Sequence, residues 1–242
     1  MLLTVTGLTR SFGGVIAVRD VTMSVAEGEI VGLIGPNGSG KTTLFNAVTG
    51  YYPPDAGTVW LDGRNITGAS AARVCRQGIA RTFQLVKPFG HLSAQDNVAV
   101  GRAYGREPAP DRATAGAEAL ALLEFVGLGD RVHTLARALT LVDRKRLELA
   151  RALAARPRLL LLDELLCGLN PSEVVDAMTL IEKIREKGIA IVMVEHLVGA
   201  VFGLSDRVVV LSSGEKIAEG PPAVIAEDPA VIEAYLGVAP GA

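Results

Sequence analysis

The sequence predicts an α/β fold, in which a central parallel sheet carries an antiparallel β subdomain and an inserted α-helical subdomain. Apolar runs at residues 29–34, 159–162 and 189–194 lack the alternation of half-exposed strands, which is typical of strands buried on both faces of a parallel sheet. A stretch rich in Ala, Leu, Arg and Glu separates the first run from the other two and predicts helices. The 242 residues, 49% of them hydrophobic, are enough for a large core.

Antiparallel strands are predicted near both ends of the chain. Residues 1–30 have the character of short strands, and VTMSV at residues 21–25 alternates apolar and polar side chains, as a strand with one solvated face does. TVWLDGRNI at residues 58–66 has strand-forming residues on both sides of an Asp-Gly pair, which predicts a hairpin. RVVVLSSGEKIAEG at residues 207–220 predicts a second hairpin, followed by a helical tail.

The middle of the chain predicts helices. Apolar residues recur at helical spacing there, as in AEALALLEFVGL at residues 117–128, whereas residues 101–116 contain Gly, Pro and polar residues and predict a loop. We therefore expect an α/β core with its antiparallel β subdomain at residues 1–87 and 157–242, and a helical subdomain at residues 88–156.

Composition excludes several classes of protein. The net charge of −2 gives no electrostatic footprint for nucleic acid. Cys75 and Cys167 form neither a disulfide framework nor a metal-binding spacing, which suits a reducing cytoplasm. The apolar runs are far shorter than the ~20 residues that span a bilayer, and the N-terminus lacks the basic start of a signal peptide. We expect a soluble protein that a partner holds if it works at a membrane.

GPNGSGKT at residues 35–42 follows a buried strand and precedes an amphipathic helix, which is the context of a phosphate-binding loop. Its three glycines permit backbone angles that turn successive N–H groups toward a polyanion, and the helix N-terminus adds partial positive charge. Lys41 can reach the β- and γ-phosphates, and the Thr42 hydroxyl can bind Mg²⁺. The segment predicts a nucleotide site on a P-loop NTPase (RecA-like) core.

Polar residues end two other buried strands. Asp163 and Glu164 follow the four leucines, at the sheet edge where α/β proteins bind ligands, although acids also end buried strands simply where they meet solvent. Beside the phosphate loop, Asp163 would bind Mg²⁺ through water and Glu164 would polarise the attacking water as a general base. His196 takes the equivalent position after residues 189–194, which places it toward the γ-phosphate, but a lone histidine is more often structural. Gln84, in RTFQ, is a bland residue by itself.

In this order the segments resemble the ATP-binding-cassette (ABC) ATPases over nearly the whole chain. The resemblance implies binding of ATP and Mg²⁺, with Phe12 of RSFGG stacked on adenine. Gln84 would link the Mg²⁺ site to a membrane subunit, and His196 would be the switch histidine. GLNP at residues 168–171 corresponds to the segment that crosses between subunits.

The resemblance also implies a full set of site residues. Glu164 and His196 are the catalytic pair, and Thr42, Gln84 and Asp163 are the metal-binding residues. The nucleotide-binding residues are Phe12, Gly35, Pro36, Asn37, Gly38, Ser39, Gly40, Lys41, Thr42, Thr43 and Gln84.

Within that family the chain is similar to the ATP-binding subunits of branched-chain amino-acid importers, in segments such as NAVTGYYPPDAGTVWLDG, GIARTFQ and the terminal AYLG. The resemblance implies ATP-dependent dimerisation with a second, identical or different cassette. The pair would drive membrane permease subunits that a periplasmic solute-binding protein supplies. The protein would then be peripheral on the cytoplasmic face of the inner membrane. Urea or amide importers and exporters remain alternatives, because they share the motor chemistry.

Members of the family that act on soluble targets fit the sequence less well. Repair-type members carry a long coiled coil in the helical region, which residues 88–156 are too short to hold. Translation-type members usually carry two cassettes in one chain, and the charge balance argues against nucleic acid. A small-molecule kinase would leave Gln84, His196 and the strand-end acids unexplained.

Two positions depart from the family pattern. Leu165 follows Glu164 where proline is usual. TLVDRKR at residues 140–146 takes the place of the signature sequence that holds the γ-phosphate of the opposite subunit's ATP. There Thr140 replaces the serine, Leu141 and Val142 replace the glycine positions, and Asp143 replaces a glutamine.

The TLVDRKR segment allows two interpretations. Thr140 and Asp143 have capping-box spacing, worth ~1 kcal/mol, and the carboxylate would repel a phosphate unless Arg144, Lys145 or Arg146 offsets it. This predicts an asymmetric motor, in which this chain's hydrolytic site needs an intact signature from a different partner. Alternatively, the N–H of Val142 and the helix dipole suffice to hold the phosphate.

Overall fold

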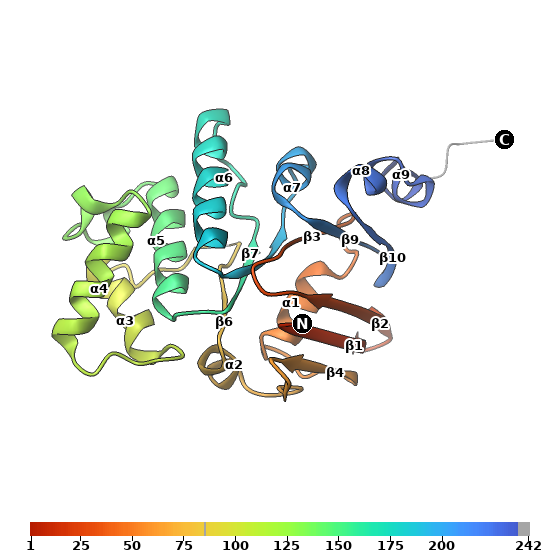
Figure 1. The fold of residues 1–242 in the computed structure, drawn as a ribbon, viewed down its shortest axis with the longest axis horizontal. Coiled ribbons are helices and arrows are strands. Elements are labelled where there is room, and N and C mark those ends of the chain that lie inside the picture. Colours follow the sequence, from red (N-terminus) through yellow and green to blue (C-terminus); the bar gives the residue numbers. More distant parts are fainter. Residues whose placement is uncertain (85, 237–242) are drawn as a thin grey trace.

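The computed structural model describes residues 1–84 and 86–236, whose strands form two sheets (Figure 1). Five strands of the larger sheet run parallel in the order β9-β3-β8-β7-β6, and β10 pairs antiparallel with β9 at one edge. This confirms the predicted α/β class with its parallel core. The strands are β3 (Ile30–Ile34), β6 (Ile79–Arg81), β7 (Leu159–Asp163), β8 (Ala190–Val194), β9 (Arg207–Ser212) and β10 (Glu215–Gly220).

The three apolar runs form the centre of this sheet. Every residue of β3, β7 and β8 is buried, because helices or the second sheet cover both faces. Asp163 of β7 pairs with Val194 of β8, so these strands end side by side. The buried runs therefore set the edge at which the polar residues appear.

The smaller sheet is antiparallel, with the strand order β2-β1-β4-β5. Asp62 and Gly63 have positive φ angles of 49° and 71°, and Leu61 pairs with Arg64 across them, as predicted for a two-residue hairpin. Its strands are β1 (Leu3–Phe12), β2 (Val15–Val25), β4 (Ala56–Leu61) and β5 (Arg64–Asn65).

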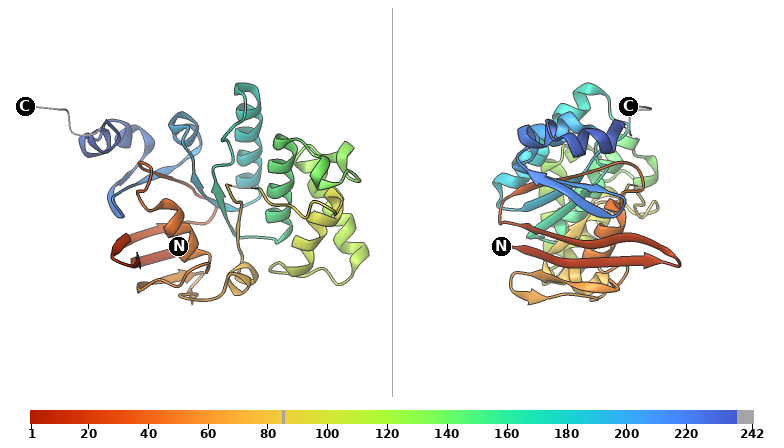
Figure 2. Two further views of the ribbon diagram at one scale, coloured as in Figure 1. Left: turned by 180° about the vertical axis from the view of Figure 1, so that it is seen from behind. Right: turned by 90° about the vertical axis from the view of Figure 1, so that its right-hand side faces the viewer.

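Helix α1 (Lys41–Val48) lies between the two sheets (Figures 1 and 2). Its Leu44 and Phe45 share one buried cluster with Val5 and Leu8 of β1 and with Leu33 of β3. The phosphate-loop helix is therefore fixed on both sides. The other core helices are α2 (Ala71–Gln77), α6 (Pro171–Glu186), α7 (Val198–Leu204), α8 (Pro222–Ala226) and α9 (Pro229–Leu236).

Three helices gather at the end of the molecule opposite α8 and α9 (Figure 1): α3 (Ala94–Tyr104), α4 (Arg112–Phe125) and α5 (Leu141–Ala154). The predicted loop at residues 101–116 is wrong, because α3 continues to Tyr104 and α4 begins at Arg112. Asp111 caps α4 by accepting a hydrogen bond from the Thr114 N–H at 2.7 Å, so its acid marks a helix start rather than a loop.

The division into a core at residues 1–87 and 157–242 and a helical subdomain at residues 88–156 stays a prediction. Leu85 and residues 237–242, which belong to the predicted core, lie outside the described residues. No helix among the described residues is long and apolar enough to cross a membrane.

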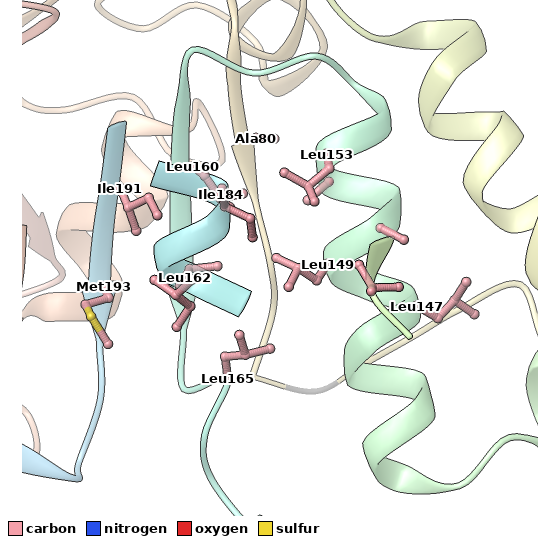
Figure 3. Packing of buried hydrophobic residues seen from close by; sticks show 14 of the residues in the cluster. Ala80, Leu147, Leu149, Leu153, Leu160, Leu162, Leu165, Ile184, Ile191 and Met193 are labelled. Carbon is pink, nitrogen blue, oxygen red and sulfur yellow. The ribbon is translucent and has the colours of Figure 1, made fainter. Parts of the chain in front are cut away.

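The larger buried cluster joins the parallel sheet to the helical end (Figure 3). Leu160 and Leu162 of β7 belong to it together with Leu149 of α5 and Ile184 of α6. Leu165, the residue in the usual proline position, is 7% exposed and packs into the same cluster. The departure from the family pattern therefore adds an apolar side chain to the core directly after the strand-end acids.

Candidate functional site

Four neighbouring parallel strands end at one edge of the sheet, and each is followed by a predicted site segment. The order β3-β8-β7-β6 places the phosphate loop, His196, the two acids and Gln84 side by side along this edge. Their order across the sheet differs from their order in the chain. Chain segments far apart in sequence thus converge, as expected at the carboxyl ends of parallel strands.

The glycines of the phosphate loop have positive φ angles but differ in how closely other parts of the chain approach them. Gly35 and Gly40 have positive φ angles of 150° and 102°. A Cβ atom on Gly35 would lie 2.0 Å from the Leu211 carbonyl oxygen, and one on Gly40 would lie 2.4 Å from that of Ala17. At Gly38, with φ of 79°, a Cβ would meet nothing within 4 Å. The loop is therefore packed tightly at its base and open at its tip, which fits a cradle for a polyanion.

Lys41 lies inside this loop. Its ammonium donates hydrogen bonds to the carbonyl oxygens of Gly35 and Pro36 at 2.8 and 2.9 Å. Burial lowers the pKa of Lys41, while the nearby carboxylates of Glu164 and Asp163 act in the opposite direction. The cation and the two acids are therefore close enough to interact electrostatically.

Three predicted residues from three strand ends meet at the carboxylate of Glu164. The Gln84 amide donates from Nε2 to one carboxylate oxygen at 2.7 Å, and Nε2 of His196 lies 3.0 Å from the other. The Glu164 side chain is only 12% exposed. Its backbone has a φ of 52°, a left-handed conformation that non-glycine residues rarely adopt and that surrounding contacts must hold. The structure thus brings Gln84, Glu164 and His196 together.

Asp163 is buried and paired with a residue that the sequence did not single out. Arg81, the last residue of β6, donates to one Asp163 carboxylate oxygen at 2.6 Å and to the Asn46 side chain at 2.6 Å. The Thr82 hydroxyl accepts a hydrogen bond from the Asp163 N–H at 3.1 Å. Only the adjacency of β6 and β7 in the sheet could have predicted this ion pair.

The predicted magnesium ligands line one cavity of about 690 Å³ between the core and the helical end. Thr42, Gln84 and Asp163 offer it a hydroxyl, an amide oxygen and a carboxylate, which are the oxygen donors that Mg²⁺ prefers. No group of three or more His, Cys, Asp or Glu residues in the described parts of the chain could hold a metal. The hydroxyl, amide oxygen and carboxylate fit an ion that takes its other ligands from phosphate and water.

Phe12 ends β1 and is 41% exposed. Tyr52 packs edge-on against it with ring centroids 5.5 Å apart, and the Arg10 guanidinium lies 4.9 Å from the Phe12 centroid. Ala17, shortly after Phe12 in the same hairpin, touches the phosphate loop at Gly40. The hairpin that carries Phe12 thus contacts the phosphate loop, and sequence reasoning missed the two side chains that pack against the ring.

The loop after Glu164 is held by two further buried ionisable residues, which the sequence analysis did not assign to the site. The Lys145 ammonium of α5 donates to three carbonyl oxygens of this loop, and a Glu195 carboxylate oxygen accepts from the Leu166 N–H at 2.7 Å. Burial raises the pKa of Glu195 to about 7. Glu195 directly precedes His196, and this position in the sequence could have pointed to a place in the site.

Comparisons with known proteins point to one family. The model described as "ABC transporter" matches residues 18–166, and one described as "Branched-chain amino acid ATP-binding cassette transporter" matches residues 215–240. The chain is 40% identical to BraF of Pseudomonas aeruginosa, a high-affinity branched-chain amino acid transport ATP-binding protein, with 98% of each chain covered.

Solved structures agree with this result. The crystal structure of an ABC-transporter ATP-binding cassette in its ADP conformation matches with a TM-score of 0.87 at 30% identity, covering 98% of both chains. A dimeric cassette in a post-hydrolysis state with ADP and phosphate matches with a TM-score of 0.82 at 25% identity, covering 91% of this chain and 99% of that one.

Proposed function

Because this chain belongs to the ABC transporter family of ATP-binding cassettes, we propose that it is the ATP-hydrolysing subunit of an importer for branched-chain amino acids. The meeting of Gln84, Glu164 and His196 beside the phosphate loop carries the enzymatic part of this proposal. The full-length similarity to BraF and the family match at residues 215–240 support the choice of solute.

The phosphate loop and its surroundings account for nucleotide binding. Residues 35–43 would hold the phosphates through backbone N–H groups and Lys41, and the exposed face of Phe12 would stack on the adenine. Thr42, Gln84 and Asp163 would hold Mg²⁺. When bound, the ion neutralises charge on the β- and γ-phosphates.

The contacts at Glu164 account for hydrolysis. Its carboxylate would accept a proton from the attacking water, and such a general base typically contributes ~10²–10⁴ in rate. Gln84 and His196 each lie within hydrogen-bond distance of one oxygen of the Glu164 carboxylate, so they would orient this carboxylate and the attacking water. The left-handed backbone of Glu164 turns its side chain toward these two residues.

The cavity of about 690 Å³ described above, which Gln84 lines, is also our candidate for the permease-binding groove. Phe83, Val74, Val100 and Tyr104 line it, and Phe83 and Tyr104 are 47% and 74% exposed. Exposed aromatic side chains around a concave surface are typical of protein interfaces. A permease helix seated there would contact the residue that precedes Gln84. The chain would then lie on the cytoplasmic face of the membrane.

A second cassette is the remaining partner. The dimeric relative supports assembly in pairs, so that each hydrolytic site faces residues of the other subunit. The opening of α5, where Leu141 is 55% exposed, would be the surface that this chain presents to its partner's nucleotide.

Transport in reconstituted vesicles tests the proposal. The chain is purified with the permease subunits that accompany it and inserted into proteoliposomes with the solute-binding protein and internal ATP. We expect uptake of radiolabelled leucine that stops with Glu164→Gln, whereas binding of a fluorescent ATP analogue persists.

Urea, acetamide and a lipopolysaccharide fragment serve as alternative cargoes in the same vesicles. Uptake of urea or acetamide without uptake of leucine would contradict the assigned solute. Full ATP hydrolysis by Glu164→Gln would contradict the assigned base.

A further inference from the structure

Two buried charged side chains on α5 contact both loops that carry the hydrolytic residues. Lys145 and Glu148 are three residues apart, so they lie on the same face of the helix. Each is 6% exposed. Charged residues are almost never buried to this extent unless they are paired or hydrogen-bonded, so their contacts need an explanation.

Lys145 holds the loop that follows Glu164. Its ammonium donates to the carbonyl oxygens of Glu164, Leu165 and Cys167 at 3.1, 2.8 and 2.6 Å. An ammonium has three N–H donors, so these three acceptors use all of them. The three carbonyl oxygens converge on one cation, and this fixes the backbone directly after the left-handed Glu164.

Glu148 holds the loop that carries Gln84. One of its carboxylate oxygens accepts a hydrogen bond from the Phe83 N–H at 2.7 Å. Gln84 follows Phe83 directly and donates to the Glu164 carboxylate. Lys145, Glu148 and both loops also surround one small cavity of about 10 Å³, so the four parts pack closely around a common point.

We propose that Lys145 and Glu148 are positioning residues for ATP hydrolysis, which hold Glu164 and Gln84 in contact from the body of α5. The proposal rests on the proposed function, because it assigns a task to residues that touch neither nucleotide nor water. Through these two residues, α5 is connected to the hydrolytic residues of its own chain. The first turn of the same helix would face the partner's nucleotide. A shift of α5 would move both loops together.

The test uses the assembled transporter, in which the chain is purified with the permease subunits and any second cassette that accompany it, and measures hydrolysis of MgATP. It compares Lys145→Met with Lys145→Arg, and Glu148→Met with Glu148→Gln. We expect kcat to fall about 10²-fold in Lys145→Met, because a misplacement of ~1 Å in an active site has this effect. KM for ATP and the affinity for a fluorescent ATP analogue should stay within about threefold, since the phosphate loop is held by other contacts. Lys145→Arg should recover most of the loss, and Glu148→Gln should resemble wild type because its amide oxygen still accepts.

Arg102→Met is the matched control. Arg102 is another buried cation, 4% exposed, which bonds Glu118 and the Glu107 carbonyl within the helical subdomain and touches neither loop. Its melting temperature should fall as that of Lys145→Met does, while its kcat stays at the wild-type value. Hydrogen–deuterium exchange should rise at residues 164–168 in Lys145→Met and not in Arg102→Met.

The outcomes separate three cases. Wild-type kcat in Lys145→Met, with only a lower melting temperature, would show that the lysine has a structural role alone. If Lys145→Met does not fold, Glu148→Met removes the contact to the other loop, and wild-type kcat in that variant would overturn the proposal. A wild-type assembled transporter that hydrolyses no ATP at all would instead contradict the proposed function.

Discussion

Glu195 is the residue whose ionisation has the clearest effect on stability. It is 4% exposed and lies near Lys145, Glu164 and His196, and burial raises its pKa from 4.5 to about 7. The folded chain therefore binds a proton more tightly than the unfolded chain does between these pH values. Its contribution to stability is then greatest below pH 4.5 and falls as the pH rises to about 7.

Glu195→Gln should remove this pH dependence. The amide oxygen can still accept from the Leu166 N–H, but no charge is buried at high pH. We expect the variant to be more stable than wild type by about 3 kcal/mol at pH 8, because each pKa unit corresponds to ~1.4 kcal/mol, with the difference vanishing near pH 4.5. Urea denaturation across pH measures it.

Glu186→Gln, at an exposed position of α6, is the control for that series. It should differ little from wild type at every pH. A constant difference between Glu195→Gln and wild type from pH 5 to pH 8 would mean that Glu195 is not the titrating group.

At the residue scale, the structure brings together residues that the motifs singled out, whereas their catalytic and binding roles stay predictions. Lys41 lies inside its loop, and Gln84, Glu164 and His196 meet, although each is far from the others in the chain. Partners such as Arg81 could not be predicted, because an arginine at a strand end has many possible acceptors. Only the sheet order selects Asp163 among them.

At the scale of elements, α5 settles how its unusual opening is arranged. The Thr140 hydroxyl accepts from the Asp143 N–H at 3.2 Å, so the predicted cap is present on that side. The three basic residues that were candidates to offset Asp143 have other partners. Arg144 donates to the Arg137 carbonyl, Lys145 to the loop after Glu164, and Arg146 lies 3.8 Å from Asp176.

This arrangement favours the asymmetric interpretation of residues 140–146. We expect the chain alone to hydrolyse ATP slowly, and Leu141→Gly with Val142→Gly to raise kcat at least tenfold. Glycines would remove the exposed Leu141 side chain and free the backbone N–H groups at the helix start for a phosphate. Steady-state ATPase assays of the purified homodimer measure the change.

Alanines at the same two positions form the control, because they remove bulk without adding backbone freedom. Full-speed hydrolysis by the unaltered homodimer, with no gain from the glycines, would show that this opening supports catalysis as it stands.

Element types were largely predictable, whereas one boundary was not. Continuous apolar runs predicted the buried strands, because a parallel sheet covered on both faces leaves no polar alternation. The prediction of a loop at residues 101–116 was wrong, because it relied on the Gly and Pro content of the segment and overlooked Asp111 as a helix cap. The helical end tolerates Gly101 because that residue packs against the backbone of α5 at Arg151, where a Cβ would not fit.

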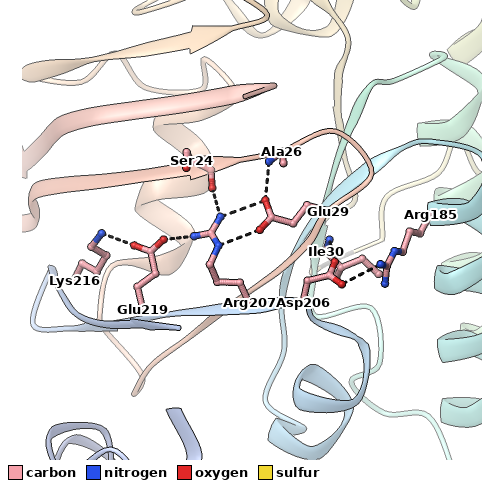
Figure 4. A network of polar contacts seen from close by, with 9 residues as sticks. All are labelled: Ser24, Ala26, Glu29, Ile30, Arg185, Asp206, Arg207, Lys216 and Glu219. Atoms are coloured by element: carbon pink, nitrogen blue, oxygen red, sulfur yellow. Dashed lines mark hydrogen bonds and ion pairs between the residues drawn. The ribbon is translucent and has the colours of Figure 1, made fainter. Parts of the chain in front are cut away.

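At the scale of the whole molecule, one partly buried guanidinium joins the two sheets (Figure 4). Arg207, at the start of β9, contacts the Glu29 carboxylate at 3.0 Å and donates to the Ser24 carbonyl of β2 at 2.7 Å. It also pairs with Glu219 of β10. Glu29 in turn accepts from the Ala26 N–H at 2.6 Å, so the connection between the sheets is fixed at both ends.

Arg207→Met should lower the free energy of unfolding by about 2–3 kcal/mol, since it breaks several hydrogen bonds to charged partners in a mostly buried site. ATP affinity should be unchanged, because none of these contacts involves the phosphate loop. Urea denaturation and nucleotide titration measure the two quantities.

Arg185→Met is the comparison for that change. Its ion pair with Asp206 is 42% and 39% exposed, so the loss should stay below about 1 kcal/mol. Equal losses in the two variants would mean that the Arg207 network does not hold the sheets together.

The sequence of strand ends along the sheet has a consequence for the tolerance of the chain to change. Neighbouring strands are ~4.8 Å apart, so the ends of β3 and β6 lie three such steps, or ~14 Å, from one another, whatever loops connect them. Lengthening a surface connection leaves the spacing of these strand ends unchanged. Deleting one residue inside β7 or β8 would pull its polar terminus back by ~3.3 Å and turn it to the opposite face, so indels should be excluded from these strands and admitted between them.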